Sequence, residues 1–329
     1  MHRIASVTNV MQTEPSSVND APARPDLYPP AAHILGAPKC GTTALAHYLA
    51  EHPQIAFSHP KETHHYSTDL PGLRRSTDDA SYRAMFSETP ATRLMIEGSV
   101  WYLYSDAAVP AILNDRPDAK FVVMLRNPVK MLPSLHSQLL HALDESEQDF
   151  RTAWNLSGQR AAGEAIPKSC RAPSTLIYTR TAAFGEMIER LFDRVPRERC
   201  KIFFQEEMAQ DTAAAYHETL AFLGLDDDRR TEFPRINEAK RSRSRALQYV
   251  IARAGPARQL ISKPVKKLTG KSSLGVHKAL KSWNDVKTGP LDIPDDLKAE
   301  IAAHYGPDMA RLGKLLDRDL SELGWPVSA

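Results

Sequence analysis

The chain has 329 residues, of which 42% are hydrophobic and 25% charged, a composition typical of a globular protein with a substantial core. Its formal net charge is only +2, which argues against a nucleic-acid-binding protein. The sequence contains no apolar run of about 18 residues, so no transmembrane helix is expected.

The N-terminus and the cysteines indicate a cytoplasmic protein. The first residues lack the continuous apolar stretch of a secretory signal. Cys40, Cys170 and Cys200 are far apart and odd in number, which suits a reducing compartment better than a disulfide framework. No spacing of cysteine and histidine is typical of a metal site, so no metal is expected.

The predicted elements alternate between strands and helices. Residues 1–29 are polar and end in a proline-rich stretch, which indicates a flexible segment before a single domain over 30–329. Short apolar runs predict strands at 31–35, 94–96, 121–125 and 201–204. Amphipathic patterns predict helices at 42–51, 129–143, 175–193, 211–223 and 295–323. This alternation predicts a three-layer α/β fold with a central parallel sheet, a P-loop-like architecture and a helical C-terminal region.

A loop with two glycines, residues 36–43, joins the first predicted strand to the first helix. Backbone N–H groups in such a loop, together with the helix N-terminus, bind phosphate. Lys39 precedes the second glycine, so the loop differs from the GxxxxGK[ST] pattern of nucleotide triphosphatases. The hydroxyls of Thr42 and Thr43 are expected at the first helical turn, facing the anion. The alternative is an ordinary helix start with threonine as its N-cap, and the whole pattern favours phosphate.

A second candidate element follows the strand at 121–125. Arg126 stands at the carboxyl end of that strand, and ligands bind at the carboxyl ends of strands in open α/β sheets. Pro128 suits a helix start, and Ser134 follows two turns later. Taken singly, Arg126 and Ser134 fit a sheet-edge cation and a surface serine equally well. Arginine is well suited to phosphate, which its planar guanidinium binds in a bidentate manner.

The two elements together resemble the signature motifs of sulfotransferases that use 3′-phosphoadenosine-5′-phosphosulfate (PAPS), particularly the heparan-sulfate-type and related bacterial branch. The resemblance covers roughly residues 32–245. It implies transfer of a sulfuryl group to a hydroxyl of an acceptor, releasing 3′-phosphoadenosine-5′-phosphate (PAP) without a metal. Arg126 and Ser134 would hold the 3′-phosphate, and Lys39 would contact the oxygen bridging sulfur and phosphorus. The residues implied to hold the 5′-phosphosulfate are Pro38, Lys39, Cys40, Gly41, Thr42 and Thr43.

The segment from His59 to Tyr66 resembles the part of the family that carries a catalytic glutamate. Glu62 matches that glutamate and His64 a histidine that commonly follows it. The acceptor hydroxyl must lose its proton as it attacks sulfur, and a positioned carboxylate or imidazole can accept that proton. We rank Glu62 first as the base, His64 second and His136 third. The alternative is a polar loop in which Glu62 pairs with Lys61.

The acceptor side departs from the family pattern. Many relatives have a lysine after the strand at 94–96, and Gly98 stands there in this chain. Trp101, Tyr102 and Tyr104 offer flat apolar faces for a sugar or an aromatic acceptor, or they pack in the core. We expect a carbohydrate, a lipid-linked alcohol or a small-molecule alcohol as acceptor.

The segment from Lys240 to Lys281 contains 12 Lys or Arg residues and no Asp or Glu. By a weaker resemblance, Lys240, Arg241 and Arg243 contact the phosphates of the nucleotide. Residues 246–281 are expected to form short amphipathic helices that contact a membrane surface or an acidic acceptor, or that pack on the domain. Two rival functions remain, a P-loop kinase that uses ATP and Mg²⁺ and a non-catalytic module that binds anions or membranes.

Overall fold

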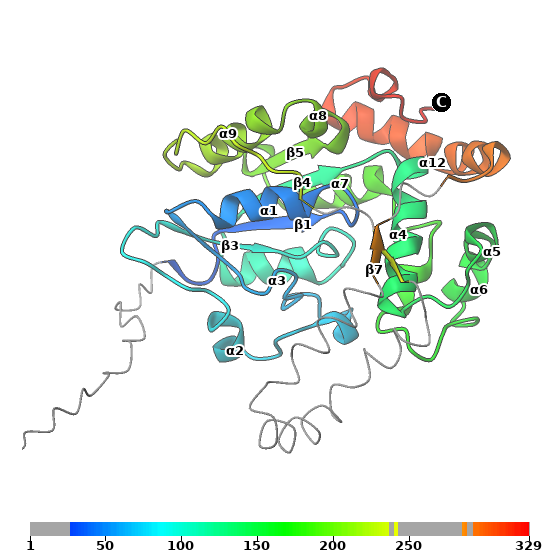
Figure 1. Ribbon diagram of the computed structural model, residues 1–329, viewed down its shortest axis with the longest axis horizontal. Helices are drawn as coiled ribbons and strands as arrows, with labels where there is room; N and C mark the ends of the chain where they lie inside the picture. Colours follow the sequence, from blue (N-terminus) through cyan, green and yellow to red (C-terminus); the bar gives the residue numbers. More distant parts are fainter. Residues whose placement is uncertain (1–26, 237–239, 243–284, 288–291, 329) are drawn as a thin grey trace, which may run out of the picture.

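A five-stranded parallel sheet forms the centre of the computed structural model, which describes residues 27–236, 240–242, 285–287 and 292–328 (Figure 1). The strand order is β2-β3-β1-β4-β5. The predicted strands are all present, and a short strand that was not predicted, β2, lies at one edge. The strands are β1 (Ala32–Gly36), β2 (Ile55–Phe57), β3 (Leu94–Gly98), β4 (Lys120–Leu125) and β5 (Cys200–Phe204).

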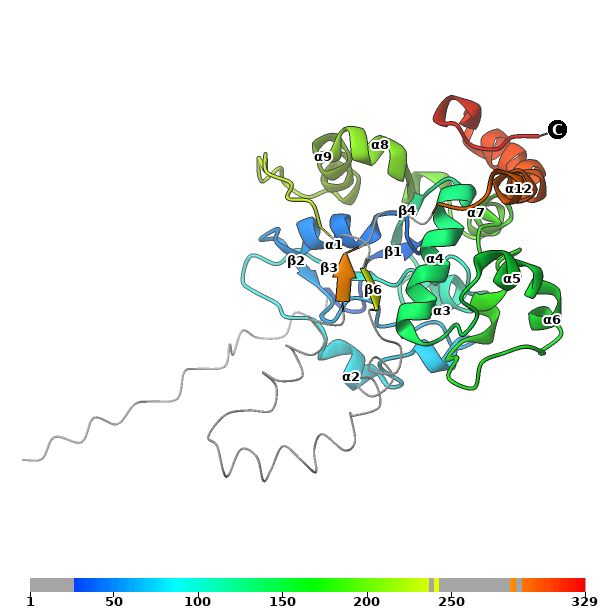
Figure 2. The same ribbon diagram turned by 45° about the vertical axis from the view of Figure 1, so that its right-hand side comes forward.

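Helices cover both faces of the sheet. The chain leaves β1 through α1 (Thr42–Ala50) towards β2, and it leaves β3 through α3 (Ala108–Asp115) towards β4 in the opposite direction. Because connections between parallel strands are right-handed, α1 and α3 lie on opposite faces. Figures 1 and 2 show the sheet between them. The predicted three-layer α/β fold is therefore confirmed, and the connections change direction at β1.

The remaining helices pack around this sheet and at its end. Helix α12 lies against α4 and α7. It ends earlier than predicted, because Asp317 adopts φ 52° and closes the helix, and a 3-10 turn, η5 (Leu320–Leu323), follows. These helices are α2 (Asp79–Arg83), α4 (Pro128–Ala142), α5 (Phe150–Asn155), α6 (Ser157–Ala161), α7 (Phe184–Phe192), α8 (Gln205–Gln210), α9 (Thr212–Leu223) and α12 (Asp295–Leu316).

A two-stranded antiparallel ribbon lies beside α4 in both ribbon views (Figures 1 and 2). It pairs β6 (Lys240–Ser242) with β7 (Asp285–Lys287). The predicted helices within residues 246–281 lie outside the described residues, as do residues 1–26 and Arg243. Leu27, within the segment predicted to be flexible, is buried in the core.

The helix predicted over 175–193 is wrong in its first half. Residues Pro173–Leu176 form a 3-10 turn, and the helix proper, α7, starts at Phe184. The backbone between them bonds to α12 instead of continuing a helix. The carbonyl of Tyr178 accepts from Tyr305 Oη at 2.5 Å, and that of Thr179 lies 2.8 Å from His304 Nε2.

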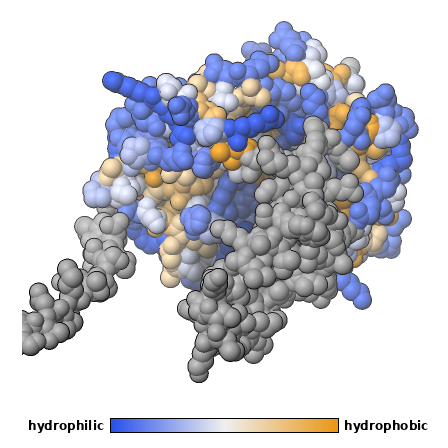
Figure 3. All heavy atoms as spheres, viewed as in Figure 1, coloured by the Kyte–Doolittle hydropathy of each residue, from blue (hydrophilic) through white to orange (hydrophobic). Residues whose placement is uncertain are grey.

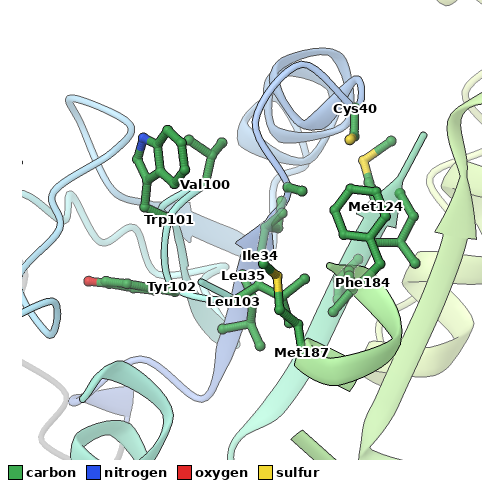
Figure 4. Close-up of a cluster of buried hydrophobic side chains, with 14 of the residues drawn as sticks. Ile34, Leu35, Cys40, Val100, Trp101, Tyr102, Leu103, Met124, Phe184 and Met187 are labelled. Atoms are coloured by element: carbon green, nitrogen blue, oxygen red, sulfur yellow. The ribbon is translucent and has the colours of Figure 1, made fainter. Parts of the chain in front are cut away.

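The core lies on both faces of β1 and β4, whose apolar residues are almost entirely buried. Strands covered on both faces are selected for continuous apolar sequence, which is why they could be predicted. Figure 4 shows part of this core, with Leu35 of β1, Met124 of β4 and Met187 of α7. Among the polar side chains buried with it are His33 of β1 and Glu97 of β3, both 0% exposed.

The surface is mainly hydrophilic on the face shown in Figure 3, with apolar residues interspersed. Among the described residues, Val327 is the large hydrophobic side chain that is exposed. No described helix combines the length and the apolar character needed to cross a bilayer.

The C-terminal turn is anchored by Trp325, which is 4% exposed and packs against Phe184 and Phe204. We expect Trp325→Ala to lower the free energy of unfolding by about 3–5 kcal/mol, because it leaves a large cavity. Val327→Ala, two residues on and 44% exposed, should change it by less than about 0.5 kcal/mol. Urea unfolding of both variants measures the difference, and equal losses would contradict the anchoring role.

Candidate active site

The loop after β1 is held at the carboxyl edge of the sheet by close backbone approach. Ala37 N donates to Met124 O of β4 at 2.7 Å. Gly36 has φ +142°, and a Cβ added there would lie 2.4 Å from Val100 O. A residue with a side chain therefore does not fit at Gly36, and the glycine is required by both conformation and space.

The loop leads directly into the N-terminus of α1. The N-cap is Gly41 in a left-handed conformation, with no side chain of the described residues capping the helix, so the threonine N-cap weighed above is not found. The first-turn amides of a helix have no partner within the helix and attract anions. Thr42 and Thr43 occupy this first turn, as predicted. The loop has the geometry of an anion site.

Lys39 and Arg126 bring two cations to this loop. Arg126, directly after β4, donates from Nη1 to Lys39 O at 3.2 Å. Its Nε is buried and has no hydrogen-bond partner among the described residues, so a donor remains available to an anion. Burial lowers the pKa of Lys39, and the nearby charge of Arg126 lowers it further. A phosphate bound beside Lys39 would act in the opposite direction and raise its pKa.

The helix after Arg126 is well capped. Asn127 Oδ1 accepts from Val129 N at 3.0 Å, and Pro128 occupies the first turn. Asn127 also donates from Nδ2 to Gly324 O at 2.7 Å, which ties the C-terminal turn to this element. Ser134 lies two turns along α4 and is partly exposed. No described contact joins it to Arg126. Its helix, α4, also lies against strand β6 of the ribbon.

Glu62 lies in the loop after β2, and Lys61 links it to the loop of residues 36–43, the phosphate loop of the sequence prediction. Lys61 Nζ donates to Glu62 Oε1 at 3.1 Å and to Thr42 Oγ1 at 3.5 Å. The ion pair with Lys61 is therefore present, and the same ammonium connects the carboxylate to the first turn of α1. A Cβ on Gly98 would lie 3.1 Å from Phe57 Cζ and in ordinary contact, at 3.6 Å, with Lys61 Cε, so the tight neighbour of this glycine is the Phe57 ring.

The surroundings keep Glu62 ionised. Burial acts to raise its pKa, but Lys61, then His64 and Arg75, outweigh burial and hold the pKa below the ordinary value of 4.5. Arg75 also donates from Nε to Glu62 O at 2.9 Å. Glu62 is thus a carboxylate, able to accept a proton, at neutral pH.

His64 and His136 occupy different surroundings. His64 is 4% exposed, and burial lowers its pKa although Glu62 and Glu97 act to raise it. His136 has its Nε2 2.8 Å from Glu147 O and packs against Phe150 and Tyr178. Residues two apart on a helix point roughly 200° apart, so His136 does not face the same way as Ser134. The structure brings Glu62, but not His136, to the phosphate loop.

The aromatic residues after β3 pack in the core. Trp101 and Tyr102 are 5% and 0% exposed. Tyr104 is partly buried, donates from its hydroxyl to Ser174 O at 2.9 Å and contacts the ring of Trp101. Of the two roles considered for these residues, core packing is the one that the contacts describe.

A protein-family model described as a sulfotransferase domain matches residues 29–248, more than half of the chain. The chain belongs to the sulfotransferase family. A solved sulfotransferase from Alicyclobacillus acidocaldarius is 25% identical with a TM-score of 0.63, and the alignment covers 89% of this chain and 98% of that one. The P-loop-like fold expected from the sequence is that of the family.

Two curated sulfotransferases match a smaller part of the chain. Carbohydrate sulfotransferase 15 of Mus musculus is 28% identical over 32% of this chain and 26% of that protein. The membrane-associated sulfotransferase kil1 of Dictyostelium discoideum is 28% identical over 30% of this chain and 20% of that protein. This sulfotransferase therefore matches about a quarter or less of the length of these relatives.

The close approach at Gly36 generates a prediction. Gly36→Ala should destabilise the sulfotransferase by about 2 kcal/mol or more, because the new Cβ meets Val100 O and the backbone must shift. Gly158→Ala is the matched control, since a Cβ there has no neighbour within 4 Å and lies on helix α6. The control should be neutral or stabilising by up to about 1 kcal/mol. Thermal unfolding compares the two, and a Gly36 variant as stable as the control would be inconsistent with the described loop.

Proposed function

We propose that this sulfotransferase moves a sulfuryl group from PAPS to a hydroxyl of an acceptor, with Glu62 as the base. The observation that carries the proposal is the position of the Lys61 ammonium, 3.5 Å from Thr42 Oγ1 and 3.1 Å from Glu62 Oε1. It supports the proposal because a proton-accepting carboxylate stands beside the loop suited to the donor's phosphate. A base next to an anion loop is what sulfuryl transfer to an alcohol requires.

In the proposed reaction the acceptor oxygen forms a bond to sulfur while the bond from sulfur to the 5′-phosphate oxygen breaks. The acceptor's proton passes to Glu62, and PAP leaves. Negative charge grows on the departing phosphate, where Lys39 and the amides at the start of α1 stabilise it. Pro38, Cys40, Gly41 and Thr43 complete the loop around the 5′-phosphosulfate. His64, neutral at pH 7 by its lowered pKa, is the second candidate for the base.

The 3′-phosphate of PAPS is assigned to Arg126 and Ser134. The unpartnered Arg126 Nε supports this assignment, because an anion can accept from it. The ribbon strand β6, which contains Lys240 and Arg241, lies beside α4, the helix that contains Ser134. We extend the assignment to Lys240, Arg241 and Arg243, the last of which lies outside the described residues.

The rival functions are less well supported. A kinase would need an acidic strand end to hold Mg²⁺, and the nearest candidate, Glu97, is buried against His33, Thr63 and Ser99. A purely anion-binding module gives no reason for a carboxylate beside the anion loop. Within the described residues no group of three or more His, Cys, Asp or Glu side chains could hold a metal ion.

We further propose a carbohydrate, lipid-linked or small-molecule alcohol as acceptor and the cytoplasm as compartment. The first is supported by the relative described as a carbohydrate sulfotransferase. The second rests on Cys40, Cys170 and Cys200, all three of which are free thiols. Peripheral membrane contact through residues 246–281 remains part of the proposal, and that segment lies outside the described residues.

The lowered pKa of Lys39 predicts an alkaline limit for nucleotide binding. As the pH rises, Lys39 loses its charge below the 10.5 of an ordinary lysine, and its attraction for phosphate is lost with it. We expect PAP affinity, measured by calorimetry, to fall as the pH rises, and to do so at a lower pH than the titration of an ordinary lysine would give. Lys39→Arg stays charged and should give a flatter profile. Parallel profiles for the two proteins would remove Lys39 from the phosphate site.

The proposal is tested by incubating the protein with PAPS and a panel of hydroxyl-bearing acceptors and measuring the mass gain of one SO₃ group. We expect turnover with PAPS and none with ATP and Mg²⁺. Glu62→Gln keeps the shape of the side chain and removes its basicity, so kcat should fall by about 10²-fold or more while PAP affinity stays nearly constant. A fully active Glu62→Gln beside an inactive His64→Ala would make the histidine the base.

A further inference from the structure

Strands β1 and β3 carry a buried pair of ionisable side chains behind the proposed base. His33 and Glu97 are paired in the parallel register, so both side chains lie on the same face of the sheet. His33 Nδ1 and Glu97 Oε2 are 3.6 Å apart, and both side chains are 0% exposed. Burying a carboxylate in a sheet is costly, and an apolar pair would serve stability at least as well. The pair therefore points to a role other than stability.

The other carboxylate oxygen of Glu97 accepts hydrogen bonds from two hydroxyls. Thr63 Oγ1 donates to Glu97 Oε1 at 3.1 Å, and Ser99 Oγ donates to the same oxygen at 2.5 Å. An ionised carboxylate can only accept, so each hydroxyl must turn its proton towards Glu97. The lone pairs of both hydroxyls are then directed elsewhere.

Each hydroxyl oxygen then accepts a hydrogen bond from a backbone amide of the loop that carries Glu62. His64 N donates to Ser99 Oγ at 2.9 Å, and His65 N donates to Thr63 Oγ1 at 3.2 Å. Glu62 N donates to Gly98 O at 2.9 Å, at the end of β3. Two amides, those of Glu62 and His64, thus bond directly to the end of β3, at Gly98 O and Ser99 Oγ. The third, His65 N, bonds within the loop to Thr63 Oγ1, and the hydroxyl of Thr63 is in turn anchored on Glu97.

This loop needs such support because two of its residues are in a conformation that side chains disfavour. Glu62 has φ 65° and His64 has φ 50°, and neither is glycine. Residues held in the left-handed region persist only where surrounding bonds fix them, and they are common at functional sites. A small relaxation of this loop would move the Glu62 carboxylate away from Thr42.

We propose that Glu97, acting through the hydroxyls of Thr63 and Ser99, is a positioning residue that fixes the Glu62 carboxylate beside the phosphate loop. The inference rests on the proposed function, because it takes Glu62 as the base. The network does not touch the phosphate loop itself through any described hydrogen bond. It should therefore affect kcat and leave nucleotide binding intact.

The test uses Thr63→Val and Ser99→Ala, which each remove one hydroxyl with little change in shape, and Glu97→Met. The matched control is Thr219→Val, since Thr219 is also 0% exposed and its hydroxyl bonds to Ala215 O on helix α9. We expect kcat to fall by about tenfold to a hundredfold in the network variants, with PAP affinity unchanged. Thr219→Val should keep the wild-type kcat, and Thr63→Ser should restore most of the activity.

The decisive measurement combines Thr63→Val with Glu62→Gln. A residue that acts through Glu62 has nothing left to position once the base is gone, so the double variant should be no slower than Glu62→Gln. Losses that multiply, or PAP affinity that falls with kcat, would mean general structural support and would overturn the inference.

Hydrogen exchange gives a readout that does not depend on activity. The amide of His65 should exchange faster in Thr63→Val and that of His64 faster in Ser99→Ala, and both should do so in Glu97→Met. Unchanged exchange overturns the inference even if no turnover is found. Wild-type protein that transfers no sulfuryl group, or a fully active Glu62→Gln, refutes the proposed function instead, while the exchange data still decide whether the network holds the loop.

Discussion

Parallel pairing of β1 with β3 and β4 is the constraint on which the site depends, because it places the carboxyl ends of neighbouring strands side by side at the carboxyl edge of the sheet. The phosphate loop follows β1, the Glu62 loop follows β2, and Arg126 follows β4. The reversal of connections at β1 leaves this edge open between the helix layers. Gly36 turns there without a side chain, against the carbonyl of Val100, and so fixes where the loop amides point.

The electrostatics of this edge follow from burial. Burial lowers the pKa of Lys39 by removing water from around its ammonium, and the nearby charge of Arg126 lowers it further. In the proposed complex, the 5′-phosphosulfate at Lys39 and the 3′-phosphate at Arg126 supply negative charge beside these cations, and this attraction contributes to the binding free energy. Lys61 is differently placed, since its charge is matched by Glu62. The charges of Lys39 and Arg126 are therefore left without an acidic partner in the described hydrogen bonds, whereas the charge of Lys61 is balanced.

The sequence predicted most of the fold because strands buried on both faces leave long apolar runs. It did not predict β2, which has only three residues, and it ended β3 before Glu97 because a charged residue usually closes an apolar run. The strand continues because His33 on β1 faces that carboxylate, a pairing that depends on the strand order β3-β1. The hydrogen bond between Lys61 and Thr42 also depends on the strand order, so it could not be predicted from the sequence. It joins two loops that become neighbours only when β2 and β3 pair beside β1.

In the reaction proposed above, the lowered pKa of Glu62 bears on when the acceptor loses its proton. A carboxylate held below the ordinary value of 4.5 is a weak base towards an alcohol, so removing the proton before attack would be strongly uphill. As the acceptor oxygen bonds to sulfur, that oxygen becomes electron-poor and its proton becomes acidic, and a weak base then suffices. Lys61 makes this order advantageous, because its charge keeps Glu62 ionised and free to accept until the bond to sulfur forms. For such a base, correct placement matters more than strength. That requirement gives a physical reason for a buried carboxylate, Glu97, that fixes the geometry of the loop.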